Sequence, residues 1–369
     1  MSTAALKFEL KPDLPPPRMT TGVLGWMRAN LFSSLFNTVL TLLMLWLLWK
    51  IIPPLLEWFF FNATFGGSDR SGCEMQSAEG EIVDRPGACW TFIKVRFLQI
   101  MFGLFYGANP DQVWRPTLML TLVAIQIGLL LWPAFRWKPQ LAMFVIFVFP
   151  FAGYALIHGE WLGLPVAETS LWGGFMLTFV LAAIGIVGAL PLGIMLALGR
   201  TSDLPFVRAI CIVFIETIRG VPLITLLFMA SNMLPLFFAA EIDFDKIARA
   251  LIAITLFQAA YTAEAIRGGL QSIPQGQFEA ADAMGLGYWK KTLFVILPQA
   301  LKISIPGTVN TFIALFKDTT LVSIIGLFDL LGISQAAARS SQWKGYDFEG
   351  YVFAASLYFM FCYGMSRYS

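Results

Sequence analysis

Long apolar runs dominate the pattern of hydrophobic and polar positions along the chain, and shorter polar segments separate them. Because a membrane-spanning helix needs about 20 mostly apolar residues, we interpret the longest runs as spans. The run at 206–240 is longer than one span requires, and Gly220 and Pro222 predict a break within it. The sequence thus predicts eight spans, at residues 31–52, 117–134, 140–158, 171–198, 206–240, 247–266, 293–316 and 348–366.

The distribution of Lys and Arg between these runs predicts their orientation. Cytoplasmic loops carry an excess of both residues. The N-terminal arm and the segments that contain Arg136, Arg200 and Arg267 are basic, whereas loops 53–91 and 159–170 carry more acidic than basic residues. Basic and acidic segments alternate along the chain. We therefore predict an all-α polytopic membrane helix bundle of about eight transmembrane helices, with both termini in the cytoplasm.

Residues 92–107 do not fit this pattern as a span. The segment is apolar but contains Lys94, Arg96 and Gln99, and its uncharged part is too short to cross a bilayer. A ninth span would also reverse the loop assignments on one side of it. We therefore predict an amphipathic helix that lies in the outer interface or packs on the bundle.

Composition agrees with a membrane protein and argues against several other classes. Hydrophobic residues make up 57% of the chain and charged residues only 13%, where soluble domains have roughly a quarter of their residues charged. The net charge is +2, and no basic run interleaves with aromatic residues, so nucleic-acid binding has no signature.

Three regions are predicted along the chain. Residues 1–30, with mixed charges around a Pro-Pro-Pro run, form a disordered cytoplasmic arm that lacks the pattern of a signal peptide. Residues 31–164 form an accessory transmembrane region with the outer loop 53–91. Residues 165–369 form a core that contains nearly all the polar groups within spans. Whether the chain continues beyond Ser369 is left open.

The four cysteines are too few for a disulfide scaffold and show no metal-binding spacing. Cys211 and Cys362 lie in apolar runs and are expected to be inert packing residues. Cys73 and Cys89 share the outer loop. A disulfide between them is compatible with an oxidising compartment, but the sequence alone leaves that pairing open.

The polar segment 272–298 interrupts the apolar pattern with a predicted short helix on the cytoplasmic side. Pro274 suits a first helical turn, and Gly285 suits a left-handed residue at the helix end. Small alanines between them permit close approach by another surface. An ordinary loop helix is the alternative, but a helix in such a connection favours a docking surface.

The same segment resembles the EAA loop of ATP-binding-cassette importer permeases. In that motif, Glu-Ala-Ala is followed by Gly four residues on and by Leu-Pro after a fixed gap. One position departs from the pattern, since Val295 stands where the family usually has Ile. The matching residues are Glu279, Ala280, Ala281, Gly285, Leu297 and Pro298.

From about Leu171 onward the chain resembles the polar amino acid uptake family of these permeases. Segment 216–223 reads Glu-Thr-Ile-Arg-Gly-Val-Pro-Leu, similar to that family's Arg-Gly-small-Pro-Leu signature. Segment 316–321 reads Phe-Lys-Asp-Thr-Thr-Leu, similar to its Lys-Asp-Thr/Ser-Thr/Ser-Leu signature. The added N-terminal region most resembles the longer permease subunit of general L-amino-acid importers.

The resemblance implies a multi-pass permease of the bacterial inner membrane with a periplasmic loop at 53–91. It further implies ATPase subunits, a second homologous permease in a heterodimer, a periplasmic amino-acid-binding protein and an L-amino acid substrate. In the family, the coupling helix sits in a cleft of the ATPase. The residues implied to contact it are Phe278, Glu279, Ala280, Ala281, Asp282, Met284 and Gly285.

Charged residues within the spans are the other candidates for function. Glu216–Arg219 and Glu264–Arg267 both occur in Glu-x-Ile-Arg-Gly, with an i,i+3 spacing that predicts neutralising pairs on one helix face. Direct contact of Glu216 and Arg219 with a substrate is the alternative, because the nearby helix break can expose backbone groups to a transport cavity.

Asp318 and Thr311 are the remaining candidates for a substrate pathway. Asp318 can meet an ammonium group of a substrate, although it can also simply mark the membrane interface. In relatives selective for basic amino acids, an acidic residue often lies seven positions earlier, where this chain has Thr311. Broad or neutral selectivity is therefore expected.

Several functions are disfavoured by missing motifs. No G-x-x-x-x-G-K-[ST] loop occurs, so the chain is expected to lack its own ATPase site, and neither an enzyme activity nor a cofactor is predicted. A permease for another small polar solute is the nearest alternative. A secondary transporter would require a coupling-ion site or inverted repeats, and a membrane scaffold or sensor would not require a built cytoplasmic helix.

Overall fold

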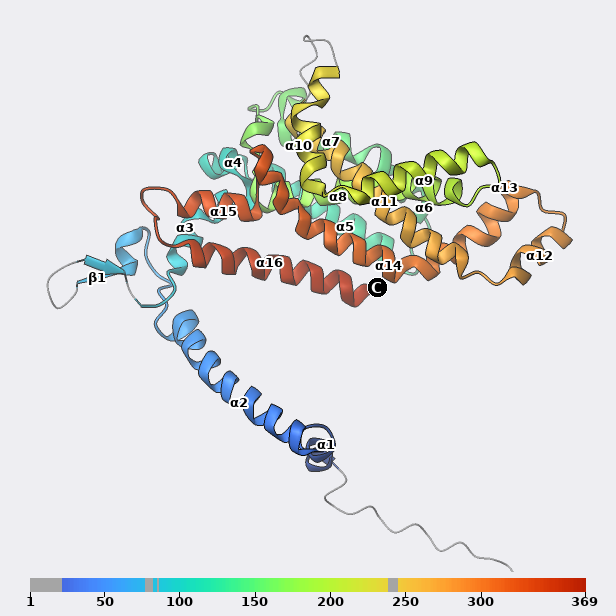
Figure 1. Ribbon diagram of the computed structural model, residues 1–369. Helices are drawn as coiled ribbons and strands as arrows, with labels where there is room; N and C mark the ends of the chain where they lie inside the picture. The colour runs from blue at the N-terminus through green and yellow to red at the C-terminus, as the bar shows by residue number, and fades with distance from the viewer. Residues whose placement is uncertain (1–21, 77–81, 85, 238–244) are drawn as a thin grey trace, which may run out of the picture. The chain divides into compact units, whose positions relative to one another are not determined.

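The computed structural model describes residues 22–76, 82–84, 86–237 and 245–369. Most of this part of the chain is helical (Figure 1). One compact unit contains the described residues up to Thr64 together with the described part of Glu74–Ala88, and the other contains Phe65–Cys73 and the described part of Cys89–Ser369. The proposed division at residue 165 stays a prediction.

Each predicted span appears as one helix or as a pair of helices. The first set is α1 (Gly22–Asn30), α2 (Leu35–Leu56), α3 (Trp90–Phe102), α4 (Leu104–Ala108), α5 (Trp114–Leu131), α6 (Lys138–Phe147) and α7 (Phe149–His158). The second set is α8 (Gly174–Arg200), α9 (Pro205–Gly220), α10 (Leu223–Asn232), α11 (Lys246–Gln271), α12 (Gln275–Ala283), α13 (Tyr288–Lys291), α14 (Leu297–Asp318), α15 (Leu330–Ala338) and α16 (Asp347–Tyr368).

Short elements complete the described structure. The strands are β1 (Glu74–Gln76), β2 (Ile82–Asp84) and β3 (Phe328–Asp329). Two π-helical turns are η1 (Glu57–Phe61) and η7 (Thr292–Ile296). The 3-10 turns are η2 (Arg70–Cys73), η3 (Pro110–Gln112), η4 (Glu160–Leu162), η5 (Thr169–Leu171), η6 (Leu234–Phe237) and η8 (Thr319–Ile325).

The first unit corrects two sequence predictions. Helix α2 does not end at residue 52 but runs through Pro53 and Pro54 and continues as η1. Each proline removes one donor, but the carbonyl oxygens of both still accept hydrogen bonds from the N–H of Glu57, so the helix continues. Residues 1–21 of the predicted arm lie outside the described residues, and its last part is helix α1.

Within the second unit, α8 and α11 pack with their backbones unusually close. A Cβ placed on Gly185 would lie 2.7 Å from Ile254, and one on Gly193 would lie 2.8 Å from Thr262. Small residues at helix interfaces permit this approach inside a membrane. Helix α14 packs on the same α11, so α8, α11 and α14 form the centre of the bundle (Figure 1).

The segment predicted at 92–107 forms α3 and α4, with a break at Gly103 where φ is 90°. Helix α3 packs against α8, α15 and α16. Phe92 and Ile100 are fully buried, while Val95 and Phe97 are exposed. Of the two placements that the sequence predicted, packing on the bundle is therefore the one observed. The exposed side chains include apolar ones, so the amphipathic character stays a prediction.

Not every predicted span passes a test of length and apolar composition. Among the described residues, four helices pass it, and six spans result if each of two bent pairs counts as one. The pairs are α6–α7, bent by 48°, and α9–α10, bent by 101°. Helices α11 and α16 contain 26 and 22 residues, long enough to span, but they are more polar. The count of eight stays a prediction.

Arg115 is the largest fully buried side chain of the accessory helices. Its guanidinium donates to the carbonyl oxygens of Leu156 and Pro165, each at 2.9 Å, and to that of Ile157. The Tyr106 ring lies 5.7 Å from it, and the Tyr106 hydroxyl also donates to Ile157. One side chain thus fastens the start of α5 to the end of α7 and to the loop that leads into α8.

Cys73 and Cys89 form a disulfide, with their Cα atoms 5.7 Å apart. The pairing that the sequence left open is therefore present. The Cys89 N–H donates to the buried carboxylate of Glu349 at 2.8 Å, which ties the disulfide to the start of α16. Because disulfides persist in oxidising compartments, this loop is expected to face outward.

Replacing both Cys73 and Cys89 with serine is expected to lower the stability of the protein. A disulfide that closes a loop of this length contributes about 3 kcal/mol, mainly by restricting the unfolded chain. The detergent-solubilised variant should unfold at a lower temperature than the unaltered protein. Adding a reductant should no longer change its unfolding temperature. A Cys211→Ser/Cys362→Ser variant is the control. An unchanged unfolding temperature for the Cys73→Ser/Cys89→Ser variant would contradict the prediction.

Candidate functional site

The segment 272–298 contains helix α12 and the single turn α13. Pro274 lies just before the first helical residue, and Gly285 follows the last turn with φ of 71°. The N–H of Leu286 donates to the Ala281 carbonyl at 3.2 Å, and that of Gly285 donates to the Asp282 carbonyl at 2.9 Å. These two bonds form a Schellman motif. The prediction that Gly285 ends the helix in a left-handed conformation is confirmed.

Helix α12 is held against α13 and the start of α14 by polar contacts, and apolar residues pack beneath it. The Asp282 carboxylate lies 2.6 Å from the Lys291 ammonium group. Gln277 accepts a hydrogen bond from Gln299 of α14 at 3.2 Å. A small apolar cluster under the helix includes Ile273, Ile296 and Ala300, with Phe278 packed against it. The helix is thus positioned by its neighbours.

Most residues predicted to contact a partner lie on the surface of this extension. Glu279, Ala280 and Met284 are exposed, the last with 76% of its surface accessible. Ala281 is buried against the chain itself. Trp289 adds an exposed aromatic side chain on α13. Figure 1 shows α12 beyond the ends of α11 and α14.

The predicted break within residues 206–240 is confirmed. Helix α9 ends at Gly220, α10 begins at Leu223, and the two axes differ by 101°. Val221 and Pro222 between them have extended backbone, with ψ of 132° and 142°. The start of α10 therefore lies at a point where the chain turns sharply.

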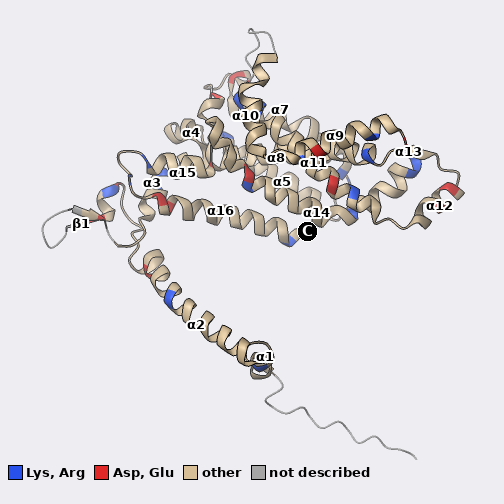
Figure 2. Ribbon diagram, in the orientation of Figure 1, with Lys and Arg blue, Asp and Glu red and all other residues tan. Residues whose placement is uncertain are grey.

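Five charged side chains meet near the C-terminal ends of α8, α9 and α11; Figure 2 shows both signs of charge in this part of the bundle. We call this group the ion cluster. Glu264 of α11 lies 2.9 Å from Arg267, 3.1 Å from Arg200 and 3.6 Å from Arg219. Arg200, the last residue of α8, also lies 2.7 Å from Glu216 of α9. Three arginines thus share two carboxylates.

The ion cluster confirms one predicted pair and contradicts the other. Glu264 and Arg267 pair as the i,i+3 spacing predicts. Glu216 and Arg219 do not pair with each other: Glu216 contacts Arg200 of the neighbouring helix. Arg219 instead reaches Glu264 and lies 5.4 Å from the Tyr261 ring. Packing of three helices offered both side chains partners outside their own helix.

Thr311 lies at the middle of the interface between α11 and α14. Its hydroxyl accepts a hydrogen bond from the Gln258 amide at 2.9 Å and donates to the Thr308 carbonyl at 2.8 Å. Gln258 is almost fully buried, and the same amide lies 3.4 Å from Thr262. This interface therefore carries uncharged polar groups at the depth where an ionisable group would be costly.

Asp318 is the last residue of α14, at the end of the helix opposite to α12, and is half-buried. It follows Thr311 by seven residues, about 10 Å along a helix. The candidate pathway residues therefore lie in three places: Glu216 and Arg219 in the ion cluster, Thr311 in the helix interface, and Asp318 at the far helix end.

Sequence reasoning missed the roles of Arg200 and Gln258. The sequence pattern marks Arg200 only as the end of a span, although a basic residue there can also pair with a carboxylate on the next helix. Gln258 is a buried polar residue within an apolar run, and that pattern was the available signal.

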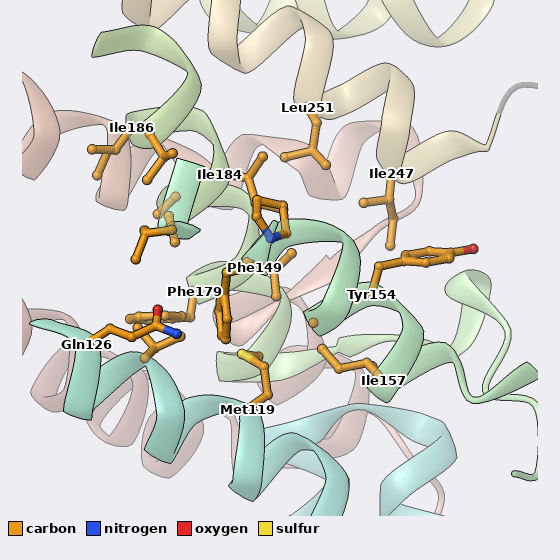
Figure 3. A pocket seen from close by; sticks show the side chains of 18 of the residues that line it. Met119, Gln126, Phe149, Tyr154, Ile157, Phe179, Ile184, Ile186, Ile247 and Leu251 are labelled. Atoms are coloured by element: carbon orange, nitrogen blue, oxygen red, sulfur yellow. The ribbon is translucent and has the colours of Figure 1, made fainter. Parts of the chain in front are cut away.

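A cavity of about 600 Å³ lies between the accessory helices and the core. Figure 3 shows apolar side chains that line it from several helices, among them Met119, Phe149, Phe179 and Leu251. Gln126 is one of its few polar groups. A zwitterionic solute would lose its hydration in such a mostly apolar cavity and gain few polar partners, so the cavity does not suit an amino acid.

Comparisons with known proteins agree on one family. The model described as binding-protein-dependent transport system inner membrane component matches residues 189–364. The inner membrane amino-acid ABC transporter permease protein YhdY of Escherichia coli is 48% identical over 97% of this chain and 94% of its own length. The glutamate/glutamine/aspartate/asparagine transport system permease protein BztC of Rhodobacter capsulatus is 40% identical over 100% and 96%.

A solved structure was matched as well, that of an amino acid ABC transporter with histidines. It is 30% identical, with a TM-score of 0.47, over 53% of this chain and 88% of that one. The two relatives that match almost the whole chain, together with the apolar helices of a multi-pass membrane protein, show the family. The chain belongs to the binding-protein-dependent transport system inner membrane components, the permeases of ATP-binding-cassette transporters.

Proposed function

We propose that this permease carries L-amino acids across the bacterial inner membrane, driven by ATP hydrolysed in a partner subunit. The observation that carries the proposal is helix α12: it is capped and held in place at one end of the bundle, yet it leaves Glu279 and Met284 exposed. A helix held in this way without covering its outer face suits a docking surface. The names of the two long relatives support the amino-acid substrate.

The partners follow from what this chain contains and lacks. Its sequence has no phosphate-binding loop for ATP, so the nucleotide site belongs to an ATPase subunit that receives α12. A periplasmic binding protein delivers the substrate to the outer side. A second, homologous permease completes the pathway, and the accessory region before residue 165 favours a heterodimer.

The substrate range is proposed to be broad or neutral rather than specific for cationic amino acids. Asp318 offers a carboxylate for the ammonium group that all amino acids share. At the position two turns earlier, Thr311 already pairs with Gln258, and neither side chain carries a negative charge. A cationic side chain would therefore find no second carboxylate there. Eight crossings with both termini inside are part of the same proposal.

The test is uptake by proteoliposomes that contain the complete complex, with ATP inside and the binding protein outside. Radiolabelled amino acid should accumulate only when ATP is enclosed. Unlabelled alanine and glutamate should compete at least as well as arginine. Competition by arginine alone would contradict the selectivity, and ATP-driven uptake of a different polar solute would contradict the amino-acid assignment.

A further inference from the structure

The ion cluster joins three helices that are otherwise held together very unequally. Helices α8 and α11 are locked by close backbone contact: besides Gly185 and Gly193, a Cβ on Gly188 would lie 2.9 Å from Thr255. Such contacts leave no room for sliding. These two helices therefore form one stiff pair.

Helix α9 is attached to this pair by much less. Ile215 is its one buried residue, and it packs in a small cluster with Ala197, Ala263 and Ile266. The outer side of α9 is apolar and exposed, as at Phe206 and Val213. Beside this cluster, the polar attachment of α9 to the pair consists of Glu216 on Arg200 and Arg219 on Glu264.

The cluster also lies between the two parts that must move together in a coupled transporter. Glu264 precedes the last residue of α11, Gln271, by seven positions, and the coupling helix α12 begins four residues later. On the other side, Arg219 immediately precedes Gly220, where α9 ends before the sharp turn into α10. One carboxylate thus connects the two regions.

Glu264 is the centre of this connection. Its side chain is only 15% exposed, and its two oxygens contact three arginines from three helices. Without this carboxylate, Arg219 would lose its ion pair, and Arg267 would lose its partner in the same helix. Arg200 would keep Glu216 alone. Partly buried guanidinium groups would then repel one another. Helix α9 would keep only the Ile215 cluster and the Glu216–Arg200 pair as attachments, so its link to α11 would be weaker at this end.

We propose that Glu264 is the coupling residue that transmits displacement of α12 to the break between α9 and α10. The proposal rests on the function proposed above. When the ATPase moves α12, the end of α11 moves with it, and Glu264 pulls Arg219 and the attached end of α9. Loss of Glu264 therefore separates ATP hydrolysis from the movement that opens or closes the pathway.

The test measures ATP hydrolysis and amino-acid uptake in parallel, in proteoliposomes of the complete complex that carry Glu264→Gln. Uptake should fall about tenfold while hydrolysis is largely retained, a change within the range for coupled sites. The number of ATP molecules hydrolysed per amino acid then rises by a similar factor. Asp203→Asn is the control. Asp203 is fully exposed, and its ion pair with Arg208 is loose, at 3.8 Å. It should leave the ratio unchanged.

Glu264→Asp provides a second variant in case the glutamine variant does not assemble. It keeps the charge but shortens the reach, so the ratio should rise less than in Glu264→Gln. An unchanged ratio in assembled complexes of both variants, or a proportional loss of hydrolysis and uptake, overturns the inference. If the unaltered complex shows no ATP-driven amino-acid uptake, the proposed function itself fails, so the two failures are distinguishable.

Discussion

Replacing Gly285 with aspartate is expected to abolish ATP-driven uptake. Gly285 has φ of 71°, which a residue with a Cβ adopts at a cost of about 1–2 kcal/mol. The strain would loosen the Schellman motif that ends α12, and with it the orientation of Glu279 and Met284. The new carboxylate would also sit on the proposed docking surface. The ATPase subunit should no longer copurify with a tagged permease.

Gly287→Asp is the matched control for this variant. Both glycines are exposed, and a Cβ on either meets no atom within 4 Å. Gly287 has φ of −66°, which any residue adopts. The same charge is therefore added two positions away without backbone strain. Copurification and uptake that survive in Gly285→Asp, or that are lost equally in both variants, would contradict the role of the helix end.

Replacing Arg115 with methionine should cause the largest loss of stability among single substitutions. The side chain is fully buried, and its guanidinium satisfies three backbone carbonyls that belong to α7 and to the loop after it. Methionine has a similar length but no donor. The Ile157 carbonyl keeps the Tyr106 hydroxyl as a donor, whereas the Leu156 and Pro165 carbonyls lose the Arg115 donor. Each buried acceptor left without a partner costs about 1–3 kcal/mol, so the loss of stability exceeds that of most single substitutions.

Thermal unfolding of the detergent-solubilised permease measures this effect. Arg208→Met serves as the control, because Arg208 is about half exposed and its partners Asp203 and the Ser202 carbonyl lie at the surface. Arg115→Met should unfold at a clearly lower temperature and be recovered from membranes in smaller amount. Equal unfolding temperatures for the two variants would show that the buried hydrogen bonds of Arg115 do not stabilise the attachment of α5 to α7.

The features that the sequence predicted correctly are local ones. Apolar runs located the long helices because a bilayer imposes a minimum length on each span. Gly220 and Pro222 indicated the turn between α9 and α10, because the backbone preferences of glycine and proline can be recognised from the residue alone. Gly285 indicated the end of α12 for the same reason. None of these features needs information about which helices are neighbours in space.

The features that were missed or wrong depend on distant parts of the chain. Glu216 pairs with Arg200, sixteen residues away, because α8 and α9 pack against each other. A spacing rule within one helix could not anticipate that partner. The acceptors of Arg115 lie 41 to 50 residues further along the chain. Helix α2 continued through Pro53 and Pro54, where the sequence favoured an end. Tertiary packing therefore determines both the Glu216–Arg200 ion pair and the hydrogen bonds of Arg115.

The assignment of candidate site residues shows the same division. Residues of α12 were identified from a linear motif, and their exposure follows from the helix that the motif encodes. The resemblance to the family points to Thr311 and Asp318, which both lie on α14. The partner of Thr311, Gln258, lies on a different helix, α11. Glu264 looked like half of a simple pair until three helices placed three arginines around it.

The most direct test of the central claim is amino-acid uptake by proteoliposomes of the purified complex, compared with and without enclosed ATP. The binding protein is supplied outside in both cases. Accumulation that requires both ATP and the ATPase subunit is the predicted result. Equal uptake without ATP, by this chain alone, would contradict the account and indicate a transporter that does not depend on an ATPase.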